Sequence, residues 1–242
     1  MITNILCLSK GYDSGYLPKS DYPMVQPFFP TANIAIRKTA LKEIGLFDEA
    51  CKTSGEDVEL CIRMAKTKWE LFFEPRAVVR HKHRTTLFSL LKQWYGYGAY
   101  HVHIFKKHAP GCLQIHYRDD KKPIGWSSLR ITRVLGLPFP AHVLIFITPF
   151  HIFNLFLIVA FFAVISKSYT LLLVASIGWI AGWLRFSEKS FFQHLTFKRN
   201  PRSIAYSMLR YLLNWTYVLG AFIAGLKAGV LYVEVTREHT PC

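Results

Sequence analysis

This sequence has few acidic residues for its basic ones, and it has no closely spaced cysteines. Among its 242 residues, Asp and Glu total 15 against 30 Lys and Arg, which gives a formal charge of +15. The five cysteines form no C-x-x-C pair, which excludes a zinc knuckle and a disulfide framework. The N-terminus lacks the basic-then-apolar pattern of a signal peptide. Because 51% of the residues are hydrophobic, a disordered chain is also excluded.

Stretches without charge distinguish the second part of the chain. Residues 141–165 contain no Lys, Arg, Asp or Glu, and further apolar runs cover about 169–185 and 211–233. A helix of the first run would be roughly 37 Å long, and a bilayer core is about 30 Å thick. The sequence therefore predicts two or three transmembrane helices. A buried hairpin in a soluble core is the alternative.

The distribution of Lys and Arg predicts the orientation of those spans. Six basic residues lie from Arg185, at the end of the second run, to Arg210, before the third run, whereas only Lys167 lies between the first and second. Because basic loops face the cytoplasm, we expect an integral membrane protein with residues 1–140 in the cytoplasm, at the inner or plasma membrane if it is bacterial. Residues 124–135 are typical of an interfacial helix, and a plain linker is the alternative.

An acidic pair begins the clearest helix of the first part. Apolar side chains recur at helical spacing over residues 58–65. Thr53 with Glu56, or Ser54 with Asp57, fits a capping box at its start. Glu56 and Asp57 then lie in the first turn, where acidic side chains complement the helix dipole. Spacing alone leaves this structural role and a catalytic role open.

Two histidines follow in a predicted strand. Residues 69–83 have the pattern of two strands separated by Pro75. His81 and His83 share one face of the second strand, because side chains alternate along a strand. Two histidines at this spacing can approach one metal ion. A basic surface strand is the simpler interpretation.

Basic and aromatic residues are interleaved over residues 76–107, which contain seven Lys and Arg and no Asp or Glu. Thr85 or Thr86 begins a helix there, and Gly96 and Gly98 predict a bend or loop within it. Such a surface suits anionic lipid headgroups or a pyrophosphate. Nucleic acid is disfavoured because no recognition motif is present.

The order of these signals resembles glycosyltransferase family 2. TANIAIRKTALKEIGLFDE precedes GEDVELCIRM, and WELFFEPRAVVRHKHR, a Gln-Trp-Tyr-Gly segment and the apolar runs follow. The resemblance covers about residues 28–108 and implies the acceptor-side half of a GT-A fold. We therefore expect an α/β fold class: a partial GT-A-like domain in residues 1–118, an interfacial linker or helix in 119–140, and a transmembrane α-helical region in 141–242.

The resemblance also implies an activity. It implies an inverting enzyme that transfers a sugar from a nucleotide-sugar donor to a lipid-linked or polysaccharide acceptor. In such enzymes the aspartate of the Glu-Asp pair is the general base, which here is Asp57, with Glu56 beside it. The alternatives are a catalytically inactive membrane assembly partner of a glycosyltransferase and a lipid-surface binding module.

Further site residues follow from the same resemblance. His81 or His83 would help to hold a metal ion or the diphosphate. Arg84, Gln93 and Trp94 would contact the diphosphate or the acceptor. The Gln-Trp segment is similar to the family's Q-x-x-R-W element, although the arginine of that element is absent.

The first half of the family's fold has no counterpart in this sequence. Only 27 residues precede the resemblance, and they contain no Asp-x-Asp motif. We therefore expect a fragment, a split-gene product or a truncated protein. A divalent cation, Mg²⁺ or Mn²⁺, is implied, but its Asp-x-Asp ligands are not in this chain. The expected partners are the donor, the acceptor, membrane lipids and a separate chain that carries the donor-binding half.

Overall fold

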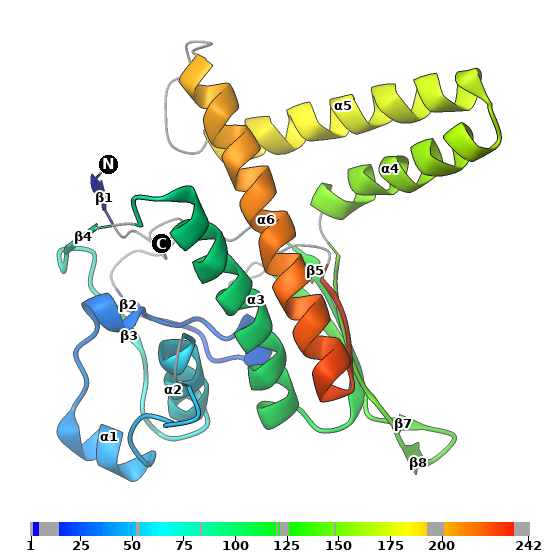
Figure 1. The fold of residues 1–242 in the computed structure, drawn as a ribbon. Helices are drawn as coiled ribbons and strands as arrows, with labels where there is room; N and C mark the ends of the chain where they lie inside the picture. The colour runs from blue at the N-terminus through cyan, green and yellow to red at the C-terminus, as the bar shows by residue number, and fades with distance from the viewer. Residues whose placement is uncertain are drawn as a thin grey trace.

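A four-stranded sheet, covered on one face by two long helices, forms the centre of the protein (Figure 1). The computed structural model describes residues 2–4, 15–51, 54–82, 84–119, 121, 126–147, 149–192 and 201–234. Short helices and two-stranded sheets of the N-terminal part lie beside this centre. The α/β part of the predicted fold class is confirmed.

The central sheet is mixed and joins distant parts of the chain. Its strands are β5 (Cys112–Arg118), β6 (Trp126–Ile131), β9 (His142–Ile147) and β10 (Val230–Glu234). Their order is β10–β9–β5–β6, in which β6 is antiparallel to β5 and the other neighbours are parallel. Cys112 and Val230 both pair with His142. One sheet therefore takes strands from all three stretches into which the sequence analysis divides the chain.

Two long helices lie side by side against the sheet (Figure 1). They are α3 (Leu87–His108) and α6 (Pro201–Ala228). Thr86, one of the two predicted starts, caps α3 by accepting a hydrogen bond from the Ser89 N–H at 3.3 Å. The bend predicted at the glycines of α3 is wrong, because the helix is continuous. Gly98 instead permits close packing, since a methyl group there would overlap the carbonyl oxygen of Tyr217 in α6.

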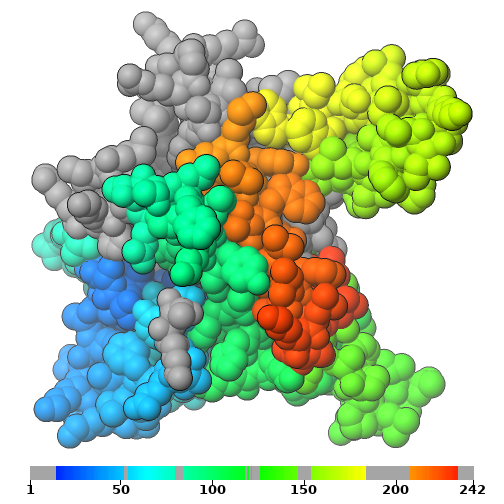
Figure 2. Space-filling model, viewed as in Figure 1, coloured from blue at the N-terminus to red at the C-terminus, as the bar shows by residue number. Residues whose placement is uncertain are grey.

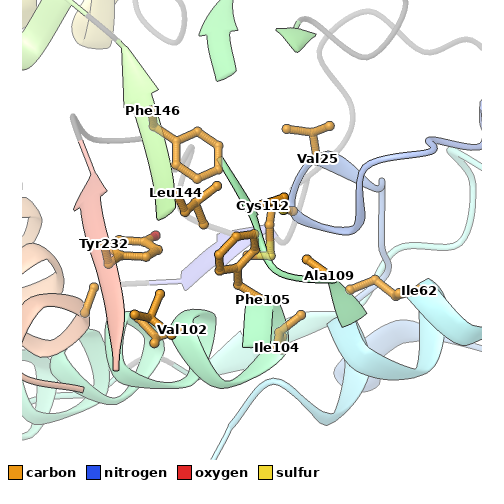
Figure 3. Close-up of a cluster of buried hydrophobic side chains, with 13 residues drawn as sticks. Val25, Ile62, Val102, Ile104, Phe105, Ala109, Cys112, Leu144, Phe146 and Tyr232 are labelled. Carbon is orange, nitrogen blue, oxygen red and sulfur yellow. The ribbon is translucent and has the colours of Figure 1, made fainter. Parts of the chain in front are cut away.

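The hydrophobic core lies between α3 and the sheet. Figure 3 shows Phe105 of α3 lying among Cys112, Leu144 and Tyr232 of three strands. These strand residues share one face because side chains alternate along a strand. They are buried, whereas Leu231, the neighbour of Tyr232, is 56% exposed. Burial of apolar area on this one face stabilises the sheet.

The N-terminal part packs on α3 through a short amphipathic helix. Its helical elements are η1 (Pro23–Val25), η2 (Thr31–Asn33), α1 (Lys38–Glu43) and α2 (Glu56–Ala65). Ile62 of α2 joins the core that contains Phe105, while Cys61 and Met64 join a second core with Leu17 and Leu71. The position of α2 between two cores fixes where its first turn lies.

Two small antiparallel sheets complete this part. The pairs are β1 (Ile2–Asn4) with β4 (Arg80–Lys82), and β2 (Gly15–Tyr16) with β3 (Phe72–Phe73). Strands β3 and β4 lie on either side of a turn at Pro75, as the sequence predicts.

A helical hairpin projects from the rest of the protein (Figures 1 and 2). It consists of α4 (Pro149–Ile165) and α5 (Tyr169–Phe192). The Asn154 Oδ1 accepts hydrogen bonds from Trp179 Nε1 at 3.2 Å and from the Tyr211 hydroxyl at 2.8 Å. This shared oxygen joins both helices of the hairpin to α6.

The predicted transmembrane α-helical region is wrong. No helix in the described part of the chain is long and apolar enough to cross a membrane. The run 141–165 is not one helix, because residues 142–147 form β9 inside the sheet and α4 keeps only 17 residues. The run 211–233 is divided as well, since α6 ends at Ala228 and β10 follows.

The helix predicted over residues 124–135 is also wrong. Strand β6 and the hairpin of β7 (Arg133–Val134) and β8 (Leu137–Pro138) occupy this region instead. The basic residues that suggested an interfacial helix include Arg130. Its guanidinium lies over the Tyr22 ring, 4.5 Å from the ring centroid, and donates to the Asp21 carbonyl at 2.7 Å.

Candidate active site

The acidic pair, Glu56 and Asp57, begins α2 as predicted, but the predicted capping box is wrong. The N-cap is Gly55, which has φ = 83° and provides no side chain. Glycine is required there because the backbone is left-handed and a Cβ would overlap the Tyr100 ring. The Ser54 hydroxyl is buried and has no hydrogen-bond partner in the described part of the chain. Thr53 lies outside the described residues.

Backbone and side-chain donors fix the acidic pair. The Thr31 hydroxyl donates to Glu56 Oε1 at 3.1 Å, and the Thr31 N–H donates to Asp57 Oδ2 at 3.4 Å. The Val58 N–H donates to Asp57 Oδ1 at 2.8 Å. Both oxygens of Asp57 therefore accept a backbone hydrogen bond, and each retains further lone pairs for a ligand.

Burial sets the protonation behaviour of Asp57. It raises the pKa of Asp57 above the ordinary 3.8, because the charged form loses hydration. The Val58 N–H lowers the pKa, while the negative charge of Glu56 raises it further. The net effect is a carboxylate that holds a proton more strongly than an exposed aspartate does. This direction suits a general base, whose strength increases with its pKa.

Helix α3 presents a phenol to the acidic pair. Burial raises the pKa of Tyr97, and the negative charges of Asp57 and Glu56 raise it further. The positive charge of Arg84 and a hydrogen bond from Gln93 act in the opposite direction. The Tyr97 side chain is still 42% exposed, so it is accessible from solvent. Four of the predicted site residues therefore influence the pKa of one tyrosine.

Trp94 lies elsewhere. Its side chain is buried between α3 and α6, where it packs with Leu213 and Tyr217. The neighbouring Gln93 instead lies on the side of α3 that carries Tyr97, one helical turn away. The structure therefore does not bring Trp94 to the acidic pair.

The predicted metal ligands remain a prediction. The backbone of His81 lies in β4 and pairs with Thr3 of β1, but its side chain and the whole of His83 lie outside the described residues. No three His, Cys, Asp or Glu side chains come together as a metal site within the residues that the structure describes. The described residues do not form a site for the implied divalent cation, and we assign no step to it.

A buried ion cluster holds the first turn of α2 against α3. Glu59 is fully buried and lies 2.7 Å from Arg63, 2.6 Å from Lys107 and 3.1 Å from His108. Burial alone would raise the pKa of Glu59, but the hydrogen bonds from Arg63 and Lys107 hold it below its ordinary value. Asp48 binds Lys107 as well, at 2.7 Å.

Two residues of this site were missed by the sequence analysis. Tyr97 has a local signal, because it stands four residues after Gln93, at the last position of the segment similar to Q-x-x-R-W. Thr31 has none, since only the fold brings it to a helix that begins 25 residues later.

Comparison with known proteins identifies the family of this chain. The family described as "Glycosyl transferase family group 2" matches residues 18–231. Pre-mycofactocin glycosyltransferases from two strains of Mycobacterium tuberculosis, CDC 1551 / Oshkosh and ATCC 25618 / H37Rv, are each 42% identical over 71 residues. That stretch is 28% of this chain and only 15% of each relative. No solved structure gives a significant match. Because the family match covers most of its residues, this chain belongs to glycosyl transferase family group 2.

Proposed function

We propose that this protein takes part in an inverting glycosyl transfer in which Asp57 is the general base. The observation that carries the proposal is the half-buried acidic pair at the start of α2, which Thr31 and the Val58 N–H hold in place and in which burial raises the pKa of Asp57. A raised carboxylate pKa beside a polar, accessible group is a common property of catalytic bases.

The chemistry needs one carboxylate and one region of positive charge. Asp57 accepts the proton of an acceptor hydroxyl while that oxygen attacks the anomeric carbon of a nucleotide sugar, and the nucleoside diphosphate leaves. Proton transfer of this kind contributes about 10²–10⁴-fold to the rate. The positive charge of Arg84 lowers the pKa of Tyr97, and a guanidinium group is suited to binding a diphosphate oxygen.

The proposed acceptor is a hydroxyl of a lipid-linked or polysaccharide sugar. The two relatives are named for pre-mycofactocin, which supplies a second acceptor for testing. The protein would be assayed together with the expected chain that carries the donor-binding half. A transfer assay with radiolabelled UDP-glucose, UDP-N-acetylglucosamine and GDP-mannose, each combined with both kinds of acceptor, would identify the substrates.

The decisive experiment replaces the proposed base. Asp57→Asn keeps the shape and removes the proton acceptor, so we expect turnover to fall by about two orders of magnitude or more. Thr39→Val, an exposed change in α1, is the matched control and should leave turnover unchanged. The assignment is wrong if Asp57→Asn keeps more than about a tenth of the activity, within the scale of such effects, while Glu56→Gln abolishes it.

A further inference from the structure

One residue contacts both members of the acidic pair. Thr31 is the first residue of η2, in a turn that follows Pro30. Its hydroxyl binds Glu56 and its N–H binds Asp57, so two different atoms of one residue hold two adjacent carboxylates. No side chain caps α2, and Thr31 connects η2 to the first turn of that helix by donating to both carboxylates.

The turn that carries Thr31 is itself held in place. The Asn33 Nδ2, two residues further along, donates to the Ala77 carbonyl at 2.7 Å. Ala77 lies in the segment that leads to β4. Because η2 is tied to α2 on one side and to this segment on the other, Thr31 is a defined point of attachment.

The two contacts have different consequences. The hydroxyl binds Glu56 Oε1 and keeps that side chain close to Asp57, since a charge-assisted hydrogen bond is stronger than a neutral one. The Thr31 N–H donates to one oxygen of Asp57, and the Val58 N–H donates to the other. Together these donors restrict the rotamers of both carboxylate side chains before the substrate binds. The side chains therefore lose less conformational entropy on binding.

We propose that Thr31 is a positioning residue that divides the roles of the two carboxylates. Its hydroxyl holds Glu56 in place as a negative charge beside Asp57. Its N–H orients Asp57 toward the acceptor. This inference rests on the proposed function of Asp57 and adds the reason why only one of the pair acts as the base.

A pH titration of the carboxylates tests this inference without a known substrate. The side-chain ¹³C signals of Asp57 and Glu56 are followed in the wild type, Thr31→Val and Thr31→Ser. Valine keeps the branched shape and the backbone N–H but removes the hydroxyl, whereas serine keeps the hydroxyl. Thr39→Val controls for loss of an exposed threonine hydroxyl.

The expected result follows from the groups that act on Asp57. Glu56 on α2 raises the pKa of Asp57, and the charge of Asp57 in turn raises the pKa of Cys61 on α2 and of Tyr97 on α3. Without the hydroxyl, Glu56 is free to move away, and its charge no longer raises the pKa of Asp57. In Thr31→Val, Asp57 should titrate at lower pH than in the wild type. In Thr31→Ser and Thr39→Val, Asp57 should titrate as in the wild type.

A second variant keeps the test independent of any folding defect. Glu56→Gln removes the same charge directly, so it should lower the pKa of Asp57 as Thr31→Val does. Adding Thr31→Val to Glu56→Gln should then cause no further change, because the hydroxyl acts through Glu56. The inference is refuted if the titration of Asp57 is unchanged in Thr31→Val, or if the two effects add in full.

Turnover separates this inference from the proposed function. Thr31→Val should lower kcat by about tenfold with little change in KM, the scale of one hydrogen bond to a charged group, and Thr31→Ser should restore it. If Asp57→Asn keeps full activity, the proposed function fails, while the titration still decides whether Thr31 positions the pair.

Discussion

Replacement of the fully buried Glu59 by glutamine tests whether the ion cluster stabilises the fold. The change keeps the side-chain volume but removes the charge that neutralises Arg63 and Lys107. Removal of one partner from a buried ion pair typically costs 3–5 kcal/mol, because the other charge is left without its partner. We therefore expect Glu59→Gln to lower the free energy of unfolding substantially.

Two features place the expected loss at the lower end of that range. Lys107 keeps Asp48 as a partner at 2.7 Å. Arg63 keeps its hydrogen bonds to the Ile44 and Leu46 carbonyls. The estimate is then about 3 kcal/mol at neutral pH.

Denaturant unfolding followed by circular dichroism would measure this loss, with the exposed Glu70→Gln as the control. The control should change the free energy of unfolding by less than about 0.5 kcal/mol. The reasoning is refuted if Glu59→Gln costs less than about 1 kcal/mol, the scale of a single ordinary hydrogen bond.

The stabilisation by Glu59 should also depend on pH. Because its pKa is below the ordinary 4.5 in the folded protein, the contribution of the carboxylate is complete above that ordinary value. It is lost as the pH falls through the folded-state pKa. The difference between the wild type and Glu59→Gln should therefore shrink in acid and stay constant near neutral pH.

Two further predictions concern the helix interface and the base. Gly98→Ala should destabilise the protein by about 1–3 kcal/mol, because the added methyl group overlaps the Tyr217 carbonyl oxygen; a melting temperature equal to that of the wild type would contradict this. The acid limb of the kcat/KM profile should lie above the ordinary aspartate pKa of 3.8, since Asp57 must lose its proton to act and its pKa is raised. A limb at or below 3.8 would show that another group titrates.

Periodicity and motif order predicted part of this protein well. The apolar repeat over residues 58–65 placed the acidic pair in the first turn of α2, where the structure has it. The ordered motifs predicted the family. The capping box failed because Gly55, a residue without a side chain, occupies the cap position, where the backbone is left-handed and the Tyr100 ring leaves no room for a Cβ.

The uncharged run at 141–165 shows why hydropathy alone does not distinguish one long transmembrane helix from a buried strand that a helix follows. Strand β9 lies in the interior of the sheet between two parallel neighbours, and such strands are continuously apolar. An apolar strand followed closely by an apolar helix therefore has the same composition as one long helix. The pairing that separates them involves residues 112–117 and 230–234, which no local pattern reveals.

The pairing of β10 with β9 also has a consequence for synthesis of the protein. Val230 pairs with His142, so the sheet gains its last strand, β10, only after α4, α5 and α6 have been synthesised. Contacts of such long sequence separation slow folding. Until β10 emerges from the ribosome, β9 has an open edge that other chains can pair with. A nascent chain halted before Val230 should therefore depend on chaperones far more than the finished one.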